Sequence, residues 1–409
     1  MSYEHIAGGV TAAKGFSAAS TAAGIKYVGR EDMAMVYSKE PCICAGTFTT
    51  NIVKAACVLW DKDIVHSGNP MHAVVINSGI ANACTGNEGF DACIKTAEAV
   101  EEALGIPYST VAVASTGVIG MQLPVDKLVN GVGAMSDKLS DTIEAGTDAS
   151  KAIMTTDTVN KEIAVTFTVG NKVVTLGGMS KGSGMIHPNM CTMLGFLTTD
   201  LKISKALLQK ALSEVVQDTF NMITVDGDTS TNDTLLIMAN GLADNVCIDS
   251  ENADYQTFKE ALFAVCEHLS RKMAADGEGA SKLFTAEVIN AKNKTAARVL
   301  ARAVVSSNLS KAAIYGCDAN FGRFLCAMGY SGAVFDQEDV ELFFVSEYGK
   351  LKVFDKGTLP EFDEEFATKI MSSKEVTVLI NMNEGDASAT AWGCDLTEKY
   401  VEINADYRS

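Results

Sequence analysis

Thr192 is the residue whose sequence surroundings define a chemistry most directly. It lies in the stretch Gly177–Asp200, where four glycines fall within eight residues and the run Cys191–Leu197 is apolar. The glycines predict a loop packed against other backbone, and the apolar run predicts a short buried strand. A cut in the bond before Thr192 would give this threonine its own base, the new α-amino group. We therefore hypothesise that Thr192 becomes an N-terminal nucleophile at the junction of loop and strand.

Two other interpretations of the glycine cluster compete with this hypothesis. A phosphate-binding loop needs Gly-Lys followed directly by Ser or Thr at the start of a helix. Here Lys181 comes before Gly182 and Gly184, and the following run is strand-like, so the phosphate interpretation is poor. The other interpretation is a Gly-rich hairpin connection between two core strands. Taken alone, this segment slightly favours the hairpin over catalysis.

A second segment offers groups that could stabilise a developing negative charge. The run Val111–Ala114 predicts a strand, which ends at Ser115, Thr116 and Gly117. A strand that ends in Thr-Gly can leave a hydroxyl and backbone N–H groups pointing into a site. The alternative is an ordinary tight turn, which is the commoner use of such a dipeptide.

Composition limits the classes of function. With 409 residues, of which 47% are hydrophobic and 21% charged, the chain can bury a large core and divide into two or three subdomains. The net charge of −18 argues against a nucleic-acid partner, because phosphates would be repelled. No window approaches the roughly 18 apolar residues that a membrane span needs. The amino terminus, Met1–His5, has neither a basic nor an apolar leader region. We expect a soluble, cytoplasmic protein without a membrane partner.

Cysteines and histidines predict neither a disulfide framework nor a metal site. The eleven cysteines are an odd count scattered through apolar contexts, and the five histidines are dispersed. The polar stretch Asp226–Thr234 superficially resembles a calcium loop. It lacks the glutamate at the twelfth position, where Ile237 stands. We expect reduced core thiols and no bound metal.

The remaining pattern predicts an α+β protein. Short strands are expected in the first eighty residues, and helices are expected to cluster after residue 200. The stretch Asn77–Gly86 predicts a small-residue loop that is too polar for the core. A long helix from about Tyr255 to Ala275 should end at Gly277, which places Glu278 just beyond it. The last seventy residues predict strands with one acidic helix near 361–371. Because no regular strand–helix alternation is evident, we expect layered sheets covered by helices and not a doubly wound fold.

The chain resembles the ornithine acetyltransferase family, also called glutamate N-acetyltransferase, of arginine biosynthesis. The family pattern Lys-Gly-x-Gly-Met-x-x-Pro-x-x-Ala-Thr-Met-Leu is matched from Lys181 to Leu194, with Cys191 in place of alanine. Further blocks that resemble the family follow in order along nearly the whole chain: Lys14–Phe16, Phe48–Asn51, Asn77–Gly79, Asn82–Gly86, Ser115–Val118, Met154–Thr158, Asp226–Thr229, Asp276–Gly279, Gly329–Gly332 and Glu402–Tyr407. Departures are small: Ile80 stands where the family often has Asn, and Asp318–Phe321 replaces Asp-Pro-Asn-Trp.

The resemblance implies a self-processing enzyme. An autocatalytic cut between Cys191 and Thr192 would give an α chain, residues 1–191, and a β chain, residues 192–409, which assemble as α₂β₂. The implied reaction moves an acetyl group from N-acetylornithine to glutamate, and some members also use acetyl-CoA as donor. No other cofactor is implied. The family fold resembles N-terminal nucleophile hydrolases in its layering but not in its connectivity.

Catalytic roles follow for the groups introduced above. A free α-amino group titrates near 8, close enough to working pH to serve Thr192 as a general base. The Thr116 hydroxyl and the Gly117 N–H match the family's oxyanion hole, where one donor is worth about 3–4 kcal/mol. Cys191 could instead be a nucleophile that moves the cut to after Met190. We favour the interpretation in which it replaces alanine as a small apolar residue.

Substrate recognition is assigned to five further positions. Lys181 matches the family's lysine for the substrate α-carboxylate, and Glu278 is the candidate for the ornithine ammonium or for a proton shuttle to the leaving amine. Thr155, Asn404 and the terminal Ser409 match family substrate contacts. Without the resemblance these three would be an ordinary strand threonine, a turn asparagine and a frayed end.

Two alternative functions remain open at this stage. An N-terminal-nucleophile aminopeptidase or amidase would pass the acyl group to water instead of to glutamate. An uncleaved small-ligand binding protein would keep the fold with a dead site. The intact set of Thr116, Gly117, Lys181, Thr192 and Glu278 argues against the binding protein.

Overall fold

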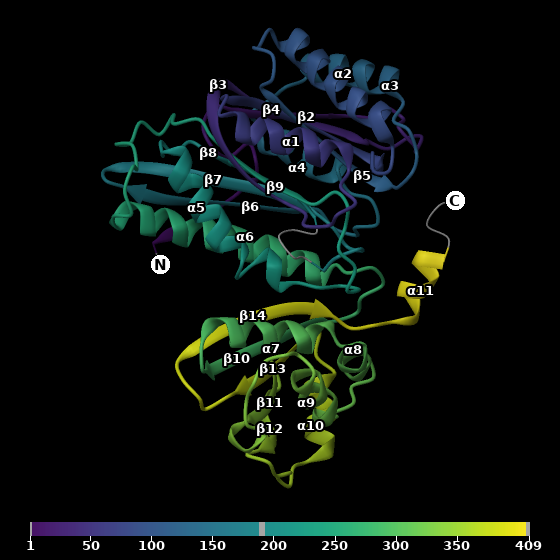
Figure 1. Ribbon diagram of the computed structural model, residues 1–409, viewed down its shortest axis with the longest axis vertical. Coiled ribbons are helices and arrows are strands. Elements are labelled where there is room, and N and C mark those ends of the chain that lie inside the picture. The colour runs from purple at the N-terminus through teal and green to yellow at the C-terminus, as the bar shows by residue number, and fades with distance from the viewer. Residues whose placement is uncertain (1, 188–192, 406–409) are drawn as a thin grey trace. The chain divides into compact units, whose positions relative to one another are not determined.

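The computed structural model describes residues 2–187 and 193–405, and the described chain divides into two compact units (Figure 1). The first unit comprises Met1–Gly182, Asn189–Gln217 and Thr229–Leu269. The second unit comprises Ser183–Pro188, Asp218–Asp228 and Ser270–Ser409. The division agrees with the expected two or three subdomains.

The first unit is built on one mixed sheet, with nine strands in the described residues. Its order is β1-β6-β7-β8-β9-β3-β4-β5, and β2 pairs with β3 outside this path. The long strand β3 pairs with β2 and β4 through its first half and with β9 through its second half. The strands are β1 Tyr3–Ile6, β2 Phe16–Thr21, β3 Met33–Phe48, β4 Met71–Ile80, β5 Val111–Val118, β6 Lys161–Val169, β7 Lys172–Lys181, β8 Leu194–Thr199 and β9 Thr234–Ala239.

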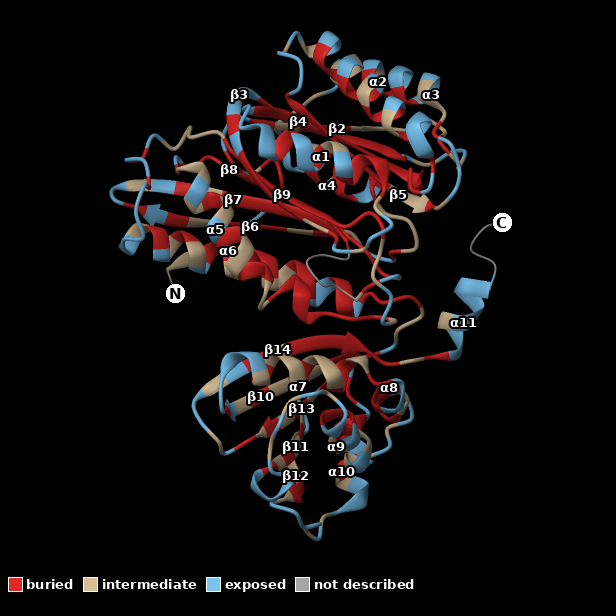
Figure 2. Ribbon diagram, in the orientation of Figure 1, coloured by how far each residue is buried: buried red, intermediate tan, exposed pale blue. Residues whose placement is uncertain are grey.

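Alternate residues of the central strands supply two separate apolar cores. Val36 and Val74 belong to one core cluster, whereas their chain neighbours Met35 and Val75 belong to the other. This follows from the period of two in a strand, which points successive side chains to opposite faces. All ten residues of β4 are buried, as expected for a strand covered on both faces (Figure 2).

Helices cover this sheet, and several of them lie earlier in the chain than expected. The helices α2 and α3 pack against each other, α4 packs on β2, and α1 packs on β5. The first-unit helices are α1 Ala56–Ser67, α2 Gly86–Leu104, α3 Val125–Ser136, α4 Ile143–Ala152 and α5 Lys205–Val216. Of the eleven described helices, α5 to α11 follow residue 200, as expected, whereas α1 to α4 precede it. The helix α6, Ala253–Ala275, contributes its residues up to Leu269 to the first unit and the rest to the second.

The second unit contains a five-stranded sheet in the order β12-β11-β13-β10-β14, counted over the described residues. The pair β10 and β13 is parallel, and the other pairs are antiparallel. The strands are β10 Leu283–Ala291, β11 Glu341–Ser346, β12 Gly349–Asp355, β13 Glu375–Asn381 and β14 Ala387–Cys394. The helices are α7 Lys294–Ser306, α8 Asn308–Tyr315, α9 Phe321–Gly329, α10 Glu364–Met371 and α11 Glu398–Ala405. Two short 3₁₀ turns, Phe220–Met222 and Gln337–Asp339, complete it.

Layered sheets with covering helices confirm the α+β class. The acidic helix near 361–371 is α10, but α11 is a second helix in the last seventy residues that the sequence pattern did not predict. No helix among the described residues is both long and apolar enough to cross a bilayer.

Two stretches expected to be loops belong instead to central strands. Gly177 and Gly178 lie inside β7, where glycine is required by close approach: a Cβ on Gly177 would lie 2.0 Å from the Gly9 carbonyl oxygen. The strand β4 continues through Asn77 and Ser78, which are buried. Asn77 accepts from the Ser115 hydroxyl at 2.7 Å and donates to the Ile80 carbonyl at 3.0 Å, so its polar side chain is satisfied inside the core.

Candidate active site

Lys181 is the centre of a polar cluster in the first unit. It is the last residue of β7 and is only 7% exposed. Its Nζ donates to the Thr155 hydroxyl at 3.0 Å and to the Thr116 hydroxyl at 3.3 Å. Thr116 lies in β5, and Thr155 lies between α4 and β6. The fold thus brings together three residues that are 26 and 65 positions apart along the chain, and all three were predicted site residues.

A buried carboxylate holds this lysine together with a second one. Asp157 Oδ1 lies 2.7 Å from Lys161 Nζ, and Asp157 Oδ2 lies 3.8 Å from Lys181 Nζ. Burial alone would raise the pKa of Asp157, but the two ammonium groups and the Gly182 N–H lower it well below its ordinary value. Asp157 is therefore ionised. Asp157, Lys161 and Lys181 together form a lysine trio with its shared carboxylate, and it carries a net charge of +1. A positive charge in this largely buried place favours an anionic ligand.

Gly117 occupies a position that only glycine can fill. Its φ is +132°, and a Cβ there would lie 2.2 Å from the Gly79 carbonyl carbon. The register of the neighbouring strand shifts between Gly79 and Ile80, which forms a bulge beside Gly117. Bulges of this kind commonly redirect groups at active sites. The alternative interpretation of Thr116-Gly117 as an ordinary tight turn is wrong, because β5 continues through both residues to Val118.

Asp233 is a buried acid beside Lys181 that the sequence did not single out. Its carboxyl accepts from the Met193 N–H and from the side chains of Ser230 and Thr49. Burial nevertheless raises its pKa well above the ordinary value, and Oδ2 has no hydrogen-bond partner within the described structure. Burial thus favours the neutral form of this carboxyl, which opposes the positive charge of the lysine trio less than an ordinary carboxylate would.

Glu278 forms a second polar cluster, in the second unit. Its backbone N–H donates to the Ser183 carbonyl at 2.8 Å, and its Oε2 accepts from Asn404 Nδ2 at 2.7 Å. Gly184 packs directly on its carboxylate, because a Cβ on that glycine would lie 2.3 Å from Glu278 Oε2. Two predicted site residues, Glu278 and Asn404, are thus in contact with each other.

Asp226 positions the loop that carries Ser183 and Gly184. Its carboxylate accepts from the Met185 N–H at 2.6 Å and from the Ile186 N–H at 2.9 Å. Tyr400 of α11 donates its hydroxyl to the same carboxylate at 3.3 Å. The helix α11 therefore supports this cluster twice, through Tyr400 and through Asn404. The polar stretch 226–234 was predicted only as a loop, and its roles depend on contacts that its own sequence does not show.

Three predicted positions fall outside the described residues. Cys191 and Thr192, at the predicted cleavage site, lie within 188–192, and Ser409 lies within 406–409. The division into chains at residue 191 therefore stays a prediction.

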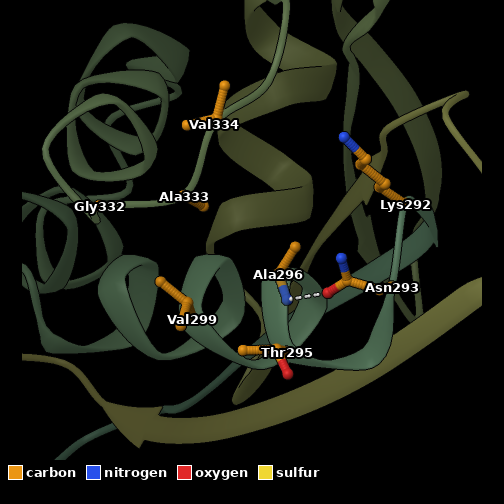
Figure 3. Close-up of a pocket in the computed structure, with 8 residues that line it drawn as sticks. All are labelled: Lys292, Asn293, Thr295, Ala296, Val299, Gly332, Ala333 and Val334. Carbon is orange, nitrogen blue, oxygen red and sulfur yellow. Dashed lines mark hydrogen bonds between the residues drawn. The ribbon is translucent and has the colours of Figure 1, made fainter.

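A surface hollow in the second unit contains none of these residues. It lies at the start of α7, where Asn293 Oδ1 accepts from the Ala296 N–H at 2.9 Å and caps the helix (Figure 3). Its lining consists of Lys292, Asn293, Thr295, Ala296, Val299, Gly332, Ala333 and Val334.

Comparison with known proteins decides the family. The model of the ArgJ family matches residues 17–409. A curated relative, arginine biosynthesis bifunctional protein ArgJ 1 of Clostridium acetobutylicum, is 50% identical over 397 residues, which are 96% of each chain. The chain belongs to the ArgJ family. It is accordingly an acyltransferase of arginine biosynthesis, as the sequence resemblance implied.

Two solved structures are also similar to this ArgJ-family chain. The arginine biosynthesis bifunctional protein of Bacillus halodurans is 44% identical, with 51% of this chain and 97% of that chain covered and a TM-score of 0.49. The ornithine acetyltransferase of Mycobacterium tuberculosis, solved in complex with ornithine, is 43% identical, with 47% and 100% covered and a TM-score of 0.42.

Proposed function

We propose that this ArgJ-family enzyme transfers an acetyl group from N-acetylornithine to glutamate through an acetyl-Thr192 intermediate. The observation that carries the proposal is the cluster in which Lys181 contacts the hydroxyls of Thr116 and Thr155 beside Asp157 and Lys161. A cluster with a net positive charge suits two substrates that both carry an α-carboxylate. The name of the Clostridium acetobutylicum relative supports the pathway.

The reaction begins with a cut before Thr192, which creates both the nucleophile and its base. The new α-amino group takes the proton of the Thr192 hydroxyl, whose oxygen attacks the acetyl carbonyl carbon of N-acetylornithine. The Thr116 hydroxyl and the Gly117 N–H stabilise the oxyanion, and the amine of ornithine leaves with the proton. Glutamate then enters, and its amine attacks the acetyl-threonine ester. The ester C–O bond breaks, one amine proton returns to the Thr192 hydroxyl through the α-amino group, and N-acetylglutamate leaves.

Recognition is assigned to the residues that resemble the family's substrate contacts. Lys181 binds the α-carboxylate that both amino acids present, and Thr155 adds a neutral hydrogen bond. Glu278, held by Asn404, binds the side-chain ammonium of ornithine or passes the proton to the leaving amine. Ser409 completes the substrate contacts.

The proposal includes processing and assembly. The chains 1–191 and 192–409 remain together as an α₂β₂ protein in the cytoplasm. Acetyl-CoA is a second acetyl donor, an activity that fits the word bifunctional in the names of the relatives.

An acetyl-transfer assay tests the function. Purified enzyme is given N-acetylornithine or acetyl-CoA as donor, and glutamate or water as acceptor. We expect N-acetylglutamate from N-acetylornithine with little release of acetate. Acetate formed at the same rate without glutamate would favour an amidase, and a single uncut chain without turnover would favour a binding protein.

A further inference from the structure

Lys282 and Cys317 form a close amine–thiol pair in the second unit, and neither residue has a role in the proposed transfer. Lys282 directly precedes β10, and Cys317 follows α8. Lys282 Nζ lies 2.9 Å from Cys317 Sγ. Lys282 is 9% exposed, so this contact is mostly removed from solvent.

The lysine side chain is fixed in place by further hydrogen bonds. Its Nζ donates to the Ile314 carbonyl of α8 at 2.8 Å and to the Met371 carbonyl of α10 at 2.9 Å. Two carbonyl oxygens and the sulfur therefore surround the nitrogen, and none of these three partners is a carboxylate. The hydrogen bonds hold the lysine nitrogen close to the sulfur, so proximity favours a reaction between the two atoms.

A second amine–thiol pair in the same unit provides a comparison. Lys311 Nζ lies 3.5 Å from Cys394 Sγ and also donates to the Cys394 carbonyl. Cys394 is 1% exposed, and burial raises the pKa of its thiol despite the nearby Lys311 ammonium. Cys317 is only half-buried and has the shorter contact with its lysine. Because an oxidant must reach a thiol to react with it, Cys317 is the more reactive candidate of the two cysteines.

We propose that Cys317 and Lys282 form a peroxide-responsive modification site, at which oxidation joins the sulfur to the lysine nitrogen. Hydroperoxides are the oxidants that this chemistry needs. The link would tie the start of β10 covalently to the segment after α8.

The reaction balances in two steps. The Cys317 thiolate attacks one oxygen of hydrogen peroxide, the O–O bond breaks, and the products are a sulfenic acid and, after proton uptake, one water. The Lys282 nitrogen, after giving up a proton to solvent, then attacks the sulfur. The S–O bond breaks, an S–N bond forms, and the second nitrogen proton leaves with the hydroxyl as water. Overall, one thiol, one amine and one hydrogen peroxide give one sulfenamide and two waters.

Peptide mapping of the full-length protein tests the site. The protein is treated with hydrogen peroxide, digested without reductant and analysed by mass spectrometry. We expect a species that joins the Lys282 peptide to the Cys317 peptide, with a mass lower by two hydrogens than the sum of the two. Thiol reductant should return both peptides. The exposed Cys326 is an internal control, because it should be oxidised without becoming linked to Lys282.

Two variants separate the proposal from general oxidation. In Lys282→Arg, the link should disappear, and a sulfenic-acid probe should label Cys317 more strongly than in the unchanged protein. In Cys317→Ser, which keeps Lys282 and its carbonyl bonds, no link to Lys282 should form. The proposal is overturned if Cys326 is oxidised while Cys317 stays a thiol, or if Cys317 is oxidised with Lys282 unlinked. A Lys311–Cys394 link of equal yield would also overturn it, because the proposal requires the more accessible and closer pair, Lys282 and Cys317, to react preferentially.

Discussion

Gly184 and Glu278 are packed so closely that the glutamate carboxylate occupies the place of a β-carbon on residue 184. A Cβ built on Gly184 would lie 2.3 Å from both Glu278 Cδ and Glu278 Oε2. The Glu278 N–H also donates to the carbonyl of Ser183, the preceding residue of the loop. The position of the carboxylate therefore depends on the absence of a side chain at residue 184.

Gly184→Ala should displace the Glu278 carboxylate and weaken transfer from N-acetylornithine. With the substrate-binding or proton-transfer role proposed for Glu278, such a shift is expected to lower kcat/KM about tenfold or more, which is about 1.4 kcal/mol or more of transition-state stabilisation. The matched control is Gly329→Ala in α9, where an added Cβ would meet nothing within 4 Å. Unchanged kinetics in Gly184→Ala, with wild-type thermal stability, would show that the carboxylate position does not matter.

Lys181→Ala should raise KM for both substrates, because the donor and the acceptor present the same α-carboxylate. Loss of a hydrogen bond to a charged group costs about 1.5–3 kcal/mol, so we expect a rise of roughly 10- to 150-fold. Lys172→Ala is the control at the other end of the same strand, since the Lys172 side chain forms an exposed ion pair with Asp244. If KM for glutamate stayed unchanged, Lys181 would have to be reassigned to structure or to cleavage.

Asp157→Asn should destabilise the first unit, because it leaves two ammonium groups without their shared carboxylate. Removing one partner of a buried pair costs about 3–5 kcal/mol. The Lys181 and Lys161 charges outweigh the effect of burial and lower the pKa of Asp157 in the folded state. Ionised Asp157 therefore stabilises the folded protein at pH values above its unfolded-state pKa of about 3.9. The stabilisation is lost as pH falls below that value.

Chemical unfolding at several pH values measures this effect. The free energy of unfolding of the unchanged protein should fall below about pH 4 more steeply than that of Asp157→Asn. Asp148→Asn serves as the control, because the Asp148 and Lys151 side chains are 53% and 55% exposed. Such an exposed pair contributes only about 0–1 kcal/mol. Equal slopes for Asp157→Asn and the unchanged protein would contradict the assigned ionisation.

The sequence could name candidate site residues but not the tertiary contacts around them. Lys181 was assigned by resemblance to the family, whereas Thr116 and Gly117 also stood out as a hydroxyl and a glycine at the end of a predicted strand. Asp157 lies in a segment that also resembled the family, yet its role depends on Lys161 four residues later and on Lys181 across the sheet. A carboxylate between two lysines is a property of tertiary contacts, so the local pattern could not reveal it.

Strands were wrongly predicted as loops where their buried residues are small or polar. Gly177 and Gly178 suggested a loop, because glycine indicates local backbone freedom. The sequence does not show that Gly9 packs closely against Gly177, which is the reason for glycine there. Asn77 and Ser78 suggested a surface, because their buried hydrogen-bond partners, Ser115 and Ala152, are distant in sequence. The long helix ending before Glu278 was predicted well, since its spacing and its stop signal are both local.

Asp61 predicts a dependence of stability on pH with the opposite sign from that of Asp157. It is fully buried, its Oδ1 accepts from the Val113 N–H at 2.7 Å, and Oδ2 has no hydrogen-bond partner in the described structure. Burial raises the pKa of Asp61 well above its ordinary value. A raised folded-state pKa means that stability is lost as pH rises above the unfolded-state pKa, by at most about 1.4 kcal/mol per pH unit for one group.

Asp61→Asn should remove this contribution, because an amide of nearly the same shape does not ionise. The difference in unfolding free energy between Asp61→Asn and the unchanged protein should shift in favour of the variant as pH rises above the unfolded-state pKa of about 3.9. Chemical denaturation across that range measures it. A difference that stays constant with pH would mean that Asp61 does not titrate on unfolding as its burial requires.

The proposed mechanism predicts that the two substrates use the site one after the other. Thr192 has a single hydroxyl, and Lys181 is proposed to bind the α-carboxylate of both substrates, so under this mechanism ornithine leaves before glutamate enters. We therefore expect ping-pong kinetics, with parallel lines in double-reciprocal plots. Incubation with N-acetylornithine alone should add one acetyl group to the peptide that begins at Thr192, and glutamate should remove it. Thr192→Ala should leave the chain uncut. Intersecting lines without an acetylated peptide would instead indicate direct transfer in a ternary complex, and Thr192 would then serve cleavage only.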